Sequence, residues 1–330
     1  EAFRIFTGAP LPEGADAVIP QEDVEARSGK PEAGREIENA KVRIRRGVGP
    51  GECVRPLGED VSEGETILDS GRSIRAAEIG LFASLGRSRV RVYRKPRVAI
   101  LSTGDEIVDL GGEPAPGKII NSNTYSLMAQ VVEAGGDPIN LGIAPDRPEA
   151  VEQRLKAGVA AADVLISSAG VSVGDYEVVR DALSRLGARL HLWKVSMRPG
   201  KPVMFASLSG RPFFGLPGNP VSAMVTFELF VRPALRKMIG DRRLFRERIV
   251  ARAATAIPNP GHRRGYLRVR LERRGEGYRA SLTGDQGSGI LRSMTLADGL
   301  AVVSPDTTIP PGGEVSVILL RFPAENGECA

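Results

Sequence analysis

Apolar residues between Arg97 and Gly240 fall into short unbroken runs separated by longer stretches with helical spacing. The short runs predict strands at 97–104, 138–146, 164–170, 190–197, 202–208 and 211–218. The longer stretches predict helices at 124–136, 148–162, 176–187 and 220–239. Strands that alternate with helices at this spacing predict right-handed crossovers and an open parallel sheet.

The two ends of the chain have a different pattern. Residues 1–70 are rich in Gly, Pro and charge, and their alternating runs Ala17–Ile19, Val42–Ile44 and Thr66–Leu68 predict a small β-rich module. Residues 74–86 have helical spacing and end in Gly, which predicts a connector helix. Strand patterns return at 265–272, 278–284, 300–304 and 315–322, as expected for a small barrel or sandwich.

These patterns together predict an α/β multidomain protein. We expect a central open parallel-sheet domain between a β-rich N-terminal module and a small C-terminal β-barrel. The predicted boundaries are 1–70 for the first module, 71–95 for the connector, 96–242 for the central domain and 243–330 for the barrel.

Composition narrows the classes of partner. The net charge is +5 and the pI is about 9.4, which favours anionic partners. Arginines are spread over the whole chain, without a Lys/Arg block or interleaved aromatics, so nucleic-acid binding is disfavoured. A phosphorylated small molecule fits this distribution better.

Cysteine and histidine are too sparse for several common kinds of site. Cys53 and Cys329 are far apart and His191 and His262 are the only histidines, so neither a disulfide framework nor a Cys/His metal site is predicted. No apolar run has the length of a membrane span, and the first residues do not resemble a signal peptide. We expect a cytoplasmic protein. The chain lacks an initiator Met, so we expect it to begin inside a longer protein.

Hydroxyl groups and glycines follow two of the predicted central strands. In an open parallel sheet, ligands bind outside the carboxyl ends of the strands. Ordinary turn chemistry is the alternative for such residues. The candidates for holding a phosphate or oxyanion are Ser102, Thr103, Gly104, Ser168 and Gly170.

Acidic residues stand at the same strand ends. Asp105 and Glu106 form either a solvated turn pair or a site where one carboxylate holds Mg²⁺ near phosphates. Asp175 precedes a helix, so capping is its default role, and a capping carboxylate still presents its second oxygen to a ligand.

Two proline-rich loops carry the remaining candidates. Arg198 and Lys201 flank a Pro-Gly turn whose rigidity reduces the entropy lost on ligand binding, so we expect contact with a phosphate or another oxyanion. Pro217, Asn219 and Pro220 lie between a strand and a helix, where Asn219 can cap the helix or contact a ligand.

Eight segments in order resemble one known family, the MoeA-type molybdopterin molybdenumtransferases, which include the gephyrin E domain. The similarity covers essentially the whole chain. The segments are TGAPLPEGADAVIPQED (7–23), VRPLGEDV (54–61), STGDE (102–106), INSN (120–123), GVSVGDY (170–176), RPGKP (198–202), GLPGNPVS (215–222) and QGSGILRSM-TLADGLAV (286–302).

The resemblance implies a reaction and its partners. Members of the family take adenylylated molybdopterin and molybdate, release AMP with the help of Mg²⁺ and leave molybdenum on the dithiolene. The family forms homodimers whose active site lies between subunits. A molybdopterin adenylyltransferase would act upstream and apo-molybdoenzymes downstream. No nucleic acid or membrane is implied as a partner.

Motif positions carry family roles onto this chain. Glu106 and Asp175 match the essential acids and metal ligands, Arg198 and Lys201 the paired cations, and Pro217 and Pro220 the prolines of the oxyanion pocket. Lys201 and Asp60 are included with these acids as catalytic candidates. The first module matches with Thr7, Arg55 and Asp60, and the last with Arg263 and Ser288.

Three departures from the family pattern are visible. Ala169 replaces a common Gly, Arg198 replaces a Lys of some relatives, and the family's N-terminal Asp-Gly-(Tyr/Phe)-Ala motif is not in this sequence. Two other functions remain open: adenylyl transfer to molybdopterin, which uses a similar central domain, and a gephyrin-like scaffold without catalysis. The first and last modules disfavour adenylyl transfer, and the retained acids and cations disfavour the scaffold.

Overall fold

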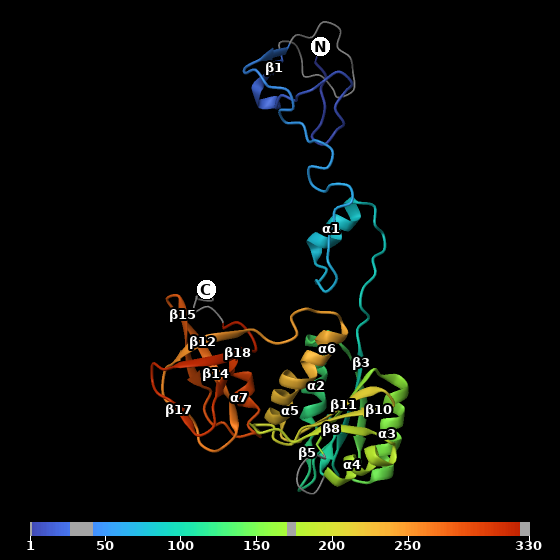
Figure 1. Ribbon diagram of the computed structural model, residues 1–330, viewed down its shortest axis with the longest axis vertical. Helices are drawn as coiled ribbons and strands as arrows, with labels where there is room; N and C mark the ends of the chain where they lie inside the picture. Colours follow the sequence, from blue (N-terminus) through green and yellow to red (C-terminus); the bar gives the residue numbers. More distant parts are fainter. Residues whose placement is uncertain (1, 27–41, 170–175, 324–330) are drawn as a thin grey trace. The chain divides into compact units, whose positions relative to one another are not determined.

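The chain folds as two units, Glu1–Asp69 and Ser70–Ala330. The computed structural model describes residues 2–26, 42–169 and 176–323 (Figure 1). The finer boundaries that we expect within the second unit remain predictions.

The first unit contains little regular structure within its described residues. Its elements are the 3-10 turn η1 (Gln21–Asp23) and the antiparallel strands β1 (Val24–Ala26) and β2 (Val42–Ile44). Of the alternating runs on which the β-rich module was predicted, Val42–Ile44 forms a strand, whereas Ala17–Ile19 and Thr66–Leu68 do not. Val18 donates a backbone hydrogen bond to the Glu52 carbonyl, but no strand ladder continues from it.

The second unit begins with the connector helix α1 (Ala76–Ser84), inside the predicted range. Its central sheet has the order β6-β3-β7-β11-β10-β8. These strands are β3 (Arg97–Thr103), β6 (Asp137–Ala144), β7 (Val164–Ser168), β8 (Arg189–Trp193), β10 (Met204–Leu208) and β11 (Arg211–Leu216). β3 is parallel to β6 and β7, and β7 is parallel to β11, which confirms the open sheet with a parallel core.

The sheet departs from the sequence prediction at β10, which is antiparallel to both β11 and β8. Ser209 and Gly210 have φ values of 50° and 74°, so a two-residue turn joins β10 to β11 as a hairpin. The strand predicted at 190–197 also divides. β8 ends at Trp193, Lys194 has a φ of 65°, and β9 (Met197–Arg198) joins a different sheet.

Helices cover both faces of the central sheet (Figure 1). One face packs on α3 (Pro148–Ala161) and α4 (Tyr176–Arg185) through Leu155 and Val179. The other face packs on α2 (Ser122–Glu133), η2 (Phe227–Val231) and α6 (Arg232–Met238), with Leu127 and Phe227 in the core. Burial on both faces explains why the central strands are almost unbroken apolar runs.

The last of the predicted helices, 220–239, has a π-helical turn in its middle. α5 (Pro220–Thr226) passes into the π turn η2, and α6 follows with Pro233 in its first turn. Proline lacks the N–H that an α-helix needs at an interior position, so the hydrogen-bond pattern changes just before it. The predicted helix is therefore confirmed over 220–238, with a π turn at Phe227–Val231 that the sequence did not predict.

The C-terminal region forms a closed five-stranded barrel. Its strands are β12 (Arg248–Ala253), β14 (Arg264–Arg274), β15 (Gly277–Leu282), β16 (Gly299–Val303) and β18 (Glu314–Leu319). They pair in the order β15-β12-β18-β16-β14, and β14 pairs with β15 again, so the sheet closes on itself. This closure decides between the barrel and the sandwich that the sequence left open.

Five short elements complete the described part of the second unit. They are the parallel pair β4 (Ile107–Val108) and β5 (Ile119–Ile120), the antiparallel pair β13 (Ile257–Asn259) and β17 (Thr307–Ile309), and α7 (Arg292–Thr295). β9 pairs with β14, and Met197, Val225 and Leu300 share one buried cluster. The central domain and the barrel therefore have an apolar core in common.

Candidate functional site at the strand ends of the central sheet

Three adjacent parallel strands end at the same level. The register pairs Ser102 of β3 with Ser168 of β7, and Ser168 with Leu216 of β11. Both serines and Thr103 are buried. The Thr103 hydroxyl has no hydrogen-bond partner within the described residues. Ser102, Thr103 and Ser168 are thus brought to one sheet edge, directly before the loop that starts with Pro217.

Two asparagines of the INSN motif connect these strand ends to α2. Asn121 caps the helix by accepting a hydrogen bond from the Thr124 N–H at 3.2 Å, and its Oδ1 lies 3.3 Å from the Ser102 hydroxyl. Asn123 donates to the Ser168 hydroxyl at 2.8 Å and to the Gly218 carbonyl at 2.7 Å. Our sequence analysis named no residue here, although the motif itself was the signal.

Glu106 lies against the end of β3. A Cβ added to Gly104 would come within 2.6 Å of the Glu106 carboxylate, and Gly104 has a φ of 141°. Only glycine therefore suits this position. Within the described residues, the exposed Glu106 carboxylate has neither a hydrogen bond nor an ion pair, which leaves it available to a ligand.

Asp105 has a structural role instead. Its N–H donates to the Asp146 carboxylate at 3.2 Å, and the Asp146 N–H donates to the Asp105 carboxylate at 3.3 Å. These two bonds connect the loop after β3 to the loop after β6. Of the acidic pair that the sequence singled out, Glu106 is thus the better candidate for ligand contact.

The RPGKP turn packs beside α5. A Cβ on Gly200, whose φ is 101°, would lie 2.4 Å from the Thr226 side chain. Arg198 and Lys201 are both exposed at this turn. Arg198 lies in β9 opposite Gly265 of the barrel, and Arg263 donates to the Met197 carbonyl at 3.4 Å.

The loop after β15 contacts the start of α5. Asn219 donates its side-chain amide to the Ser288 hydroxyl at 3.0 Å, and the Val221 N–H donates to the Ser288 carbonyl at 3.1 Å. Asn219 occupies the N-cap position of α5 without a side-chain capping bond, and Pro220 is the first helical residue. The structure thus brings Asn219, Pro220 and Ser288 together.

A fully buried arginine lies behind this contact. Arg268 of β14 has no exposed surface, and burial lowers the pKa of its guanidinium to about 10, with Arg198 lowering it further and Asp285 opposing the shift. The side chain remains protonated at neutral pH and adds positive charge near Arg198. Our sequence analysis did not select Arg268, because alternation within a strand does not distinguish a buried cation from an exposed one.

The remaining predicted site residues lie in the first unit or outside the described residues. Thr7, Arg55 and Asp60 belong to the first unit and are exposed there, and Arg55 pairs with Glu59 at 3.1 Å. Gly170 and Asp175 lie outside the described residues. Their assigned roles stay predictions.

In the part of the chain that the structure describes, no group of three or more His, Cys, Asp or Glu side chains is arranged to hold a metal ion. A site for Mg²⁺ does not require such a group, because this ion is commonly bound by one or two carboxylates together with substrate phosphates and water. The available Glu106 carboxylate fits that mode of binding.

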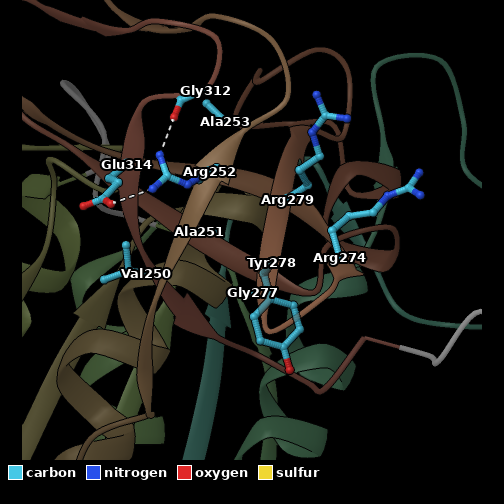
Figure 2. Close-up of a pocket in the computed structure, with 10 residues that line it drawn as sticks. All are labelled: Val250, Ala251, Arg252, Ala253, Arg274, Gly277, Tyr278, Arg279, Gly312 and Glu314. Carbon is cyan, nitrogen blue, oxygen red and sulfur yellow. Dashed lines mark hydrogen bonds and ion pairs between the residues drawn. The ribbon is translucent and has the colours of Figure 1, made fainter.

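A separate cavity of about 800 Å³ lies on the barrel surface (Figure 2). It opens where β12 and β15 pair over only two residues each. Arg252 donates hydrogen bonds there to the Gly312 carbonyl at 3.2 Å and to the Glu314 carboxylate at 3.3 Å. The side chains of Arg274 and Arg279 point away from Arg252 (Figure 2). The three guanidinium groups do not converge, so this cavity is a poorer anion site than the sheet edge.

None of the helices in the described residues has the length and hydropathy of a membrane-spanning segment.

The fold and the sheet edge define an α/β protein with a candidate ligand site at the carboxyl ends of its central parallel strands. Three family models match the chain: the MoeA N-terminal region (domain I and II) at residues 1–86, a probable molybdopterin binding domain at 99–237 and the MoeA C-terminal region (domain IV) at 250–320.

Similar proteins agree with these matches. A molybdopterin molybdenumtransferase of Nostoc sp. is 38% identical over 328 residues, which cover 98% of this chain and 72% of the relative. Molybdopterin molybdenumtransferase 1 of Mycobacterium tuberculosis is 34% identical over 99% of this chain and 75% of its own. A molybdopterin biosynthesis MoeA protein structure from Pyrococcus horikoshii has a TM-score of 0.77 at 31% identity and covers 94% of this chain and 74% of its own.

The chain therefore belongs to the molybdopterin molybdenumtransferase (MoeA) family, transferases of molybdenum cofactor biosynthesis. The family and the multidomain fold inferred from the sequence motifs are confirmed.

Proposed function

We propose that this protein transfers molybdenum from molybdate to adenylylated molybdopterin, with Mg²⁺-dependent release of AMP. The observation that carries the proposal is the alignment of Ser102, Ser168 and Leu216 across β3, β7 and β11. This register places hydroxyl groups, the Pro217 loop and the Glu106 carboxylate at one sheet edge.

The chemistry brings several negative charges together. Attack of water on the pyrophosphate P–O bond gives AMP and the terminal phosphate of molybdopterin. The two dithiolene thiols then bind molybdenum, and one molybdate oxygen leaves as water with their two protons. Arg198 and Lys201 offset the repulsion between phosphates and oxyanion. Ser102, Ser168 and the rigid Pro217–Pro220 loop orient the substrate, so less entropy is lost when it reacts.

Mg²⁺ would be held by Glu106 and, as the family resemblance implies, by Asp175. Bound there, the ion supplies Lewis-acid stabilisation of charge on the phosphate oxygens. The family resemblance also assigns substrate binding to Thr7 and Arg55 and catalysis to Asp60, and it implies a homodimer with its active site between subunits. We expect this enzyme in the cytoplasm, receiving substrate from an adenylyltransferase and supplying apo-molybdoenzymes.

The test is an assay of AMP release with adenylylated molybdopterin, Mg²⁺ and molybdate, combined with reconstitution of an apo-molybdoenzyme. Molybdate-dependent AMP release supports the proposal. ATP consumption without it indicates adenylyl transfer, and tight peptide binding without turnover indicates a scaffold. Asp175→Asn and Glu106→Gln should each abolish turnover and keep the fold; unchanged rates would refute the roles assigned to these acids.

The proposed homodimer is tested by measuring the mass of the assembly and the activity of mixed variants. Sedimentation analysis should give twice the mass of one chain, and mixing two differently inactivated variants should restore part of the activity if the site lies between subunits. A monomer with full activity would contradict this part of the proposal.

A further inference from the structure

The Arg268 guanidinium forms hydrogen bonds with the loop that follows β15. Its Nε donates to the Ser293 hydroxyl at 3.0 Å, and its Nη2 donates to the carbonyls of Gly287 at 2.9 Å and Asp285 at 3.4 Å. One planar guanidinium thus connects three points of the segment 285–293. A lysine ammonium is a point charge and does not reproduce this fork.

The backbone of Arg268 is bound to the same loop. Its N–H donates to the Gln286 side-chain oxygen at 2.8 Å, and the Gln286 amide donates back to the Arg268 carbonyl at 3.2 Å. Arg268 pairs with Leu300 of β16 on one side, but the pairing of β14 with β15 on the other side begins only at Val269. Gln286 bonds to the Arg268 main chain on that second side. The loop is therefore held both by the side chain and by the main chain of one residue.

The far side of this loop reaches the candidate site. Ser288 accepts hydrogen bonds from the Asn219 amide through its hydroxyl and from the Val221 N–H through its carbonyl. Both donors belong to the start of α5, next to the strand ends. A displacement of the loop would consequently move Ser288 and release Asn219.

We propose that Arg268 is a positioning residue, which holds the loop 285–288 so that Ser288 stays in contact with the start of α5. Its consequence for catalysis rests on the proposed function, whereas its effect on the loop does not. The guanidinium is buried without a carboxylate among its hydrogen-bond partners in the described residues, so its full charge also adds to the field at Arg198.

Hydrogen exchange tests the positioning without an activity assay. In Arg268→Lys, the amides of Gly287 and Val221 should exchange about tenfold faster than in the unmodified protein, as expected for the loss of hydrogen bonds to a charged group. Arg270→Lys is the matched control, since Arg270 is exposed on the same strand. Unchanged exchange in Arg268→Lys would overturn the proposal.

A second variant covers the case in which Arg268→Lys does not fold. Gln286→Ala removes the main-chain attachment without altering the buried charge, and it should also accelerate exchange at Gly287 and Val221. If exchange at these amides is unchanged while the protein remains folded, the loop is held by other contacts and the proposal is wrong.

A double-mutant cycle tests the catalytic consequence. We expect Arg268→Lys to lower kcat/KM for AMP release about tenfold in the unmodified background and less than twofold in the Ser288→Ala background. The effects should not add, because each substitution disrupts the same contact between Ser288 and the start of α5. Equal effects in both backgrounds would show that Arg268 does not act through Ser288. An unmodified protein that releases no AMP contradicts the proposed function but leaves the exchange result valid.

Discussion

The side-chain amide of Asn123 lies 2.8 Å from the Ser168 hydroxyl oxygen and 2.7 Å from the Gly218 carbonyl oxygen. One residue of α2 thereby joins the ends of β7 and β11. The amide donates both bonds, and a carboxylate at this position has no proton to donate. The alignment of these two strand ends thus depends on an asparagine.

Replacing Asn123 with Asp should lower the free energy of unfolding by about 1–3 kcal/mol, because it removes both donors and adds a charge beside a carbonyl. It should also raise the KM for adenylylated molybdopterin. Urea unfolding and steady-state kinetics measure the two effects. Ser122→Ala, on the exposed side of the same turn, is the control. Equal stability of Asn123→Asp and the unmodified protein would argue against this role.

Gly104→Ala should displace Glu106. The added methyl would overlap the carboxylate at 2.6 Å, and misplacement of a reacting group by about 1 Å costs on the order of 10²-fold in rate. The measurement is AMP release at saturating Mg²⁺, with circular dichroism to confirm folding. Gly111→Ala is the matched control, because Gly111 has a φ of 91° but no atom within 4 Å of an added Cβ. Similar losses in both variants would indicate backbone strain rather than displacement of Glu106.

Asp163, at the opposite end of the sheet, should make stability depend on pH. Hydrogen bonds from the Arg94 guanidinium and the Arg97 N–H hold the pKa of this carboxyl well below its usual range, although burial opposes them. A carboxyl with a lowered folded-state pKa stabilises the protein above the unfolded-state value of about 4, and this contribution is lost as the pH falls through the folded-state value.

Asp163→Asn should therefore lower the free energy of unfolding at pH 7 by about 1–2 kcal/mol, a modest value because the arginines are largely exposed. Thermal unfolding between pH 7 and pH 2 should show a smaller decrease in Tm for the variant. Asp137→Asn, an exposed carboxylate at the start of β6, is the control. A parallel decrease in variant and unmodified protein would contradict the assignment.

Arg246 should stabilise the contact between the barrel and the central domain. It donates to the Glu228 carboxylate at 2.8 Å and to the Leu320 carbonyl at 2.8 Å, and Gln130 also donates to Glu228 at 2.9 Å. Glu228 is buried within the π turn. Removing one partner of a buried ion pair leaves an uncompensated charge.

Arg246→Met is accordingly expected to lower the free energy of unfolding by about 3 kcal/mol, and the double variant with Glu228→Gln to recover part of that loss. Chemical denaturation of both variants measures this, with Arg243→Met in the same linker as the exposed control. A double variant no more stable than Arg246→Met would mean that the buried charge is not the cause.

Local sequence signals determined much of the fold. The apolar runs at β3 and β7 and the spacing of α3 predicted these elements closely. Burial on both faces of a sheet gives an unbroken apolar run, and burial on one side of a helix gives apolar residues at helical spacing. Ser102, Ser168 and Pro217 were also identifiable, since parallel strands place their carboxyl ends at one edge.

Tertiary structure decided what local patterns leave open. The direction of β10 depended on the Ser209-Gly210 turn, and the closure of the barrel on pairing between β12 and β15. The buried position of Arg268 and the contact of Asn219 with Ser288 arise from packing between segments distant in sequence. Side-chain periodicity reports which face of a strand is buried, but the partner that covers that face is set only when the whole chain has folded.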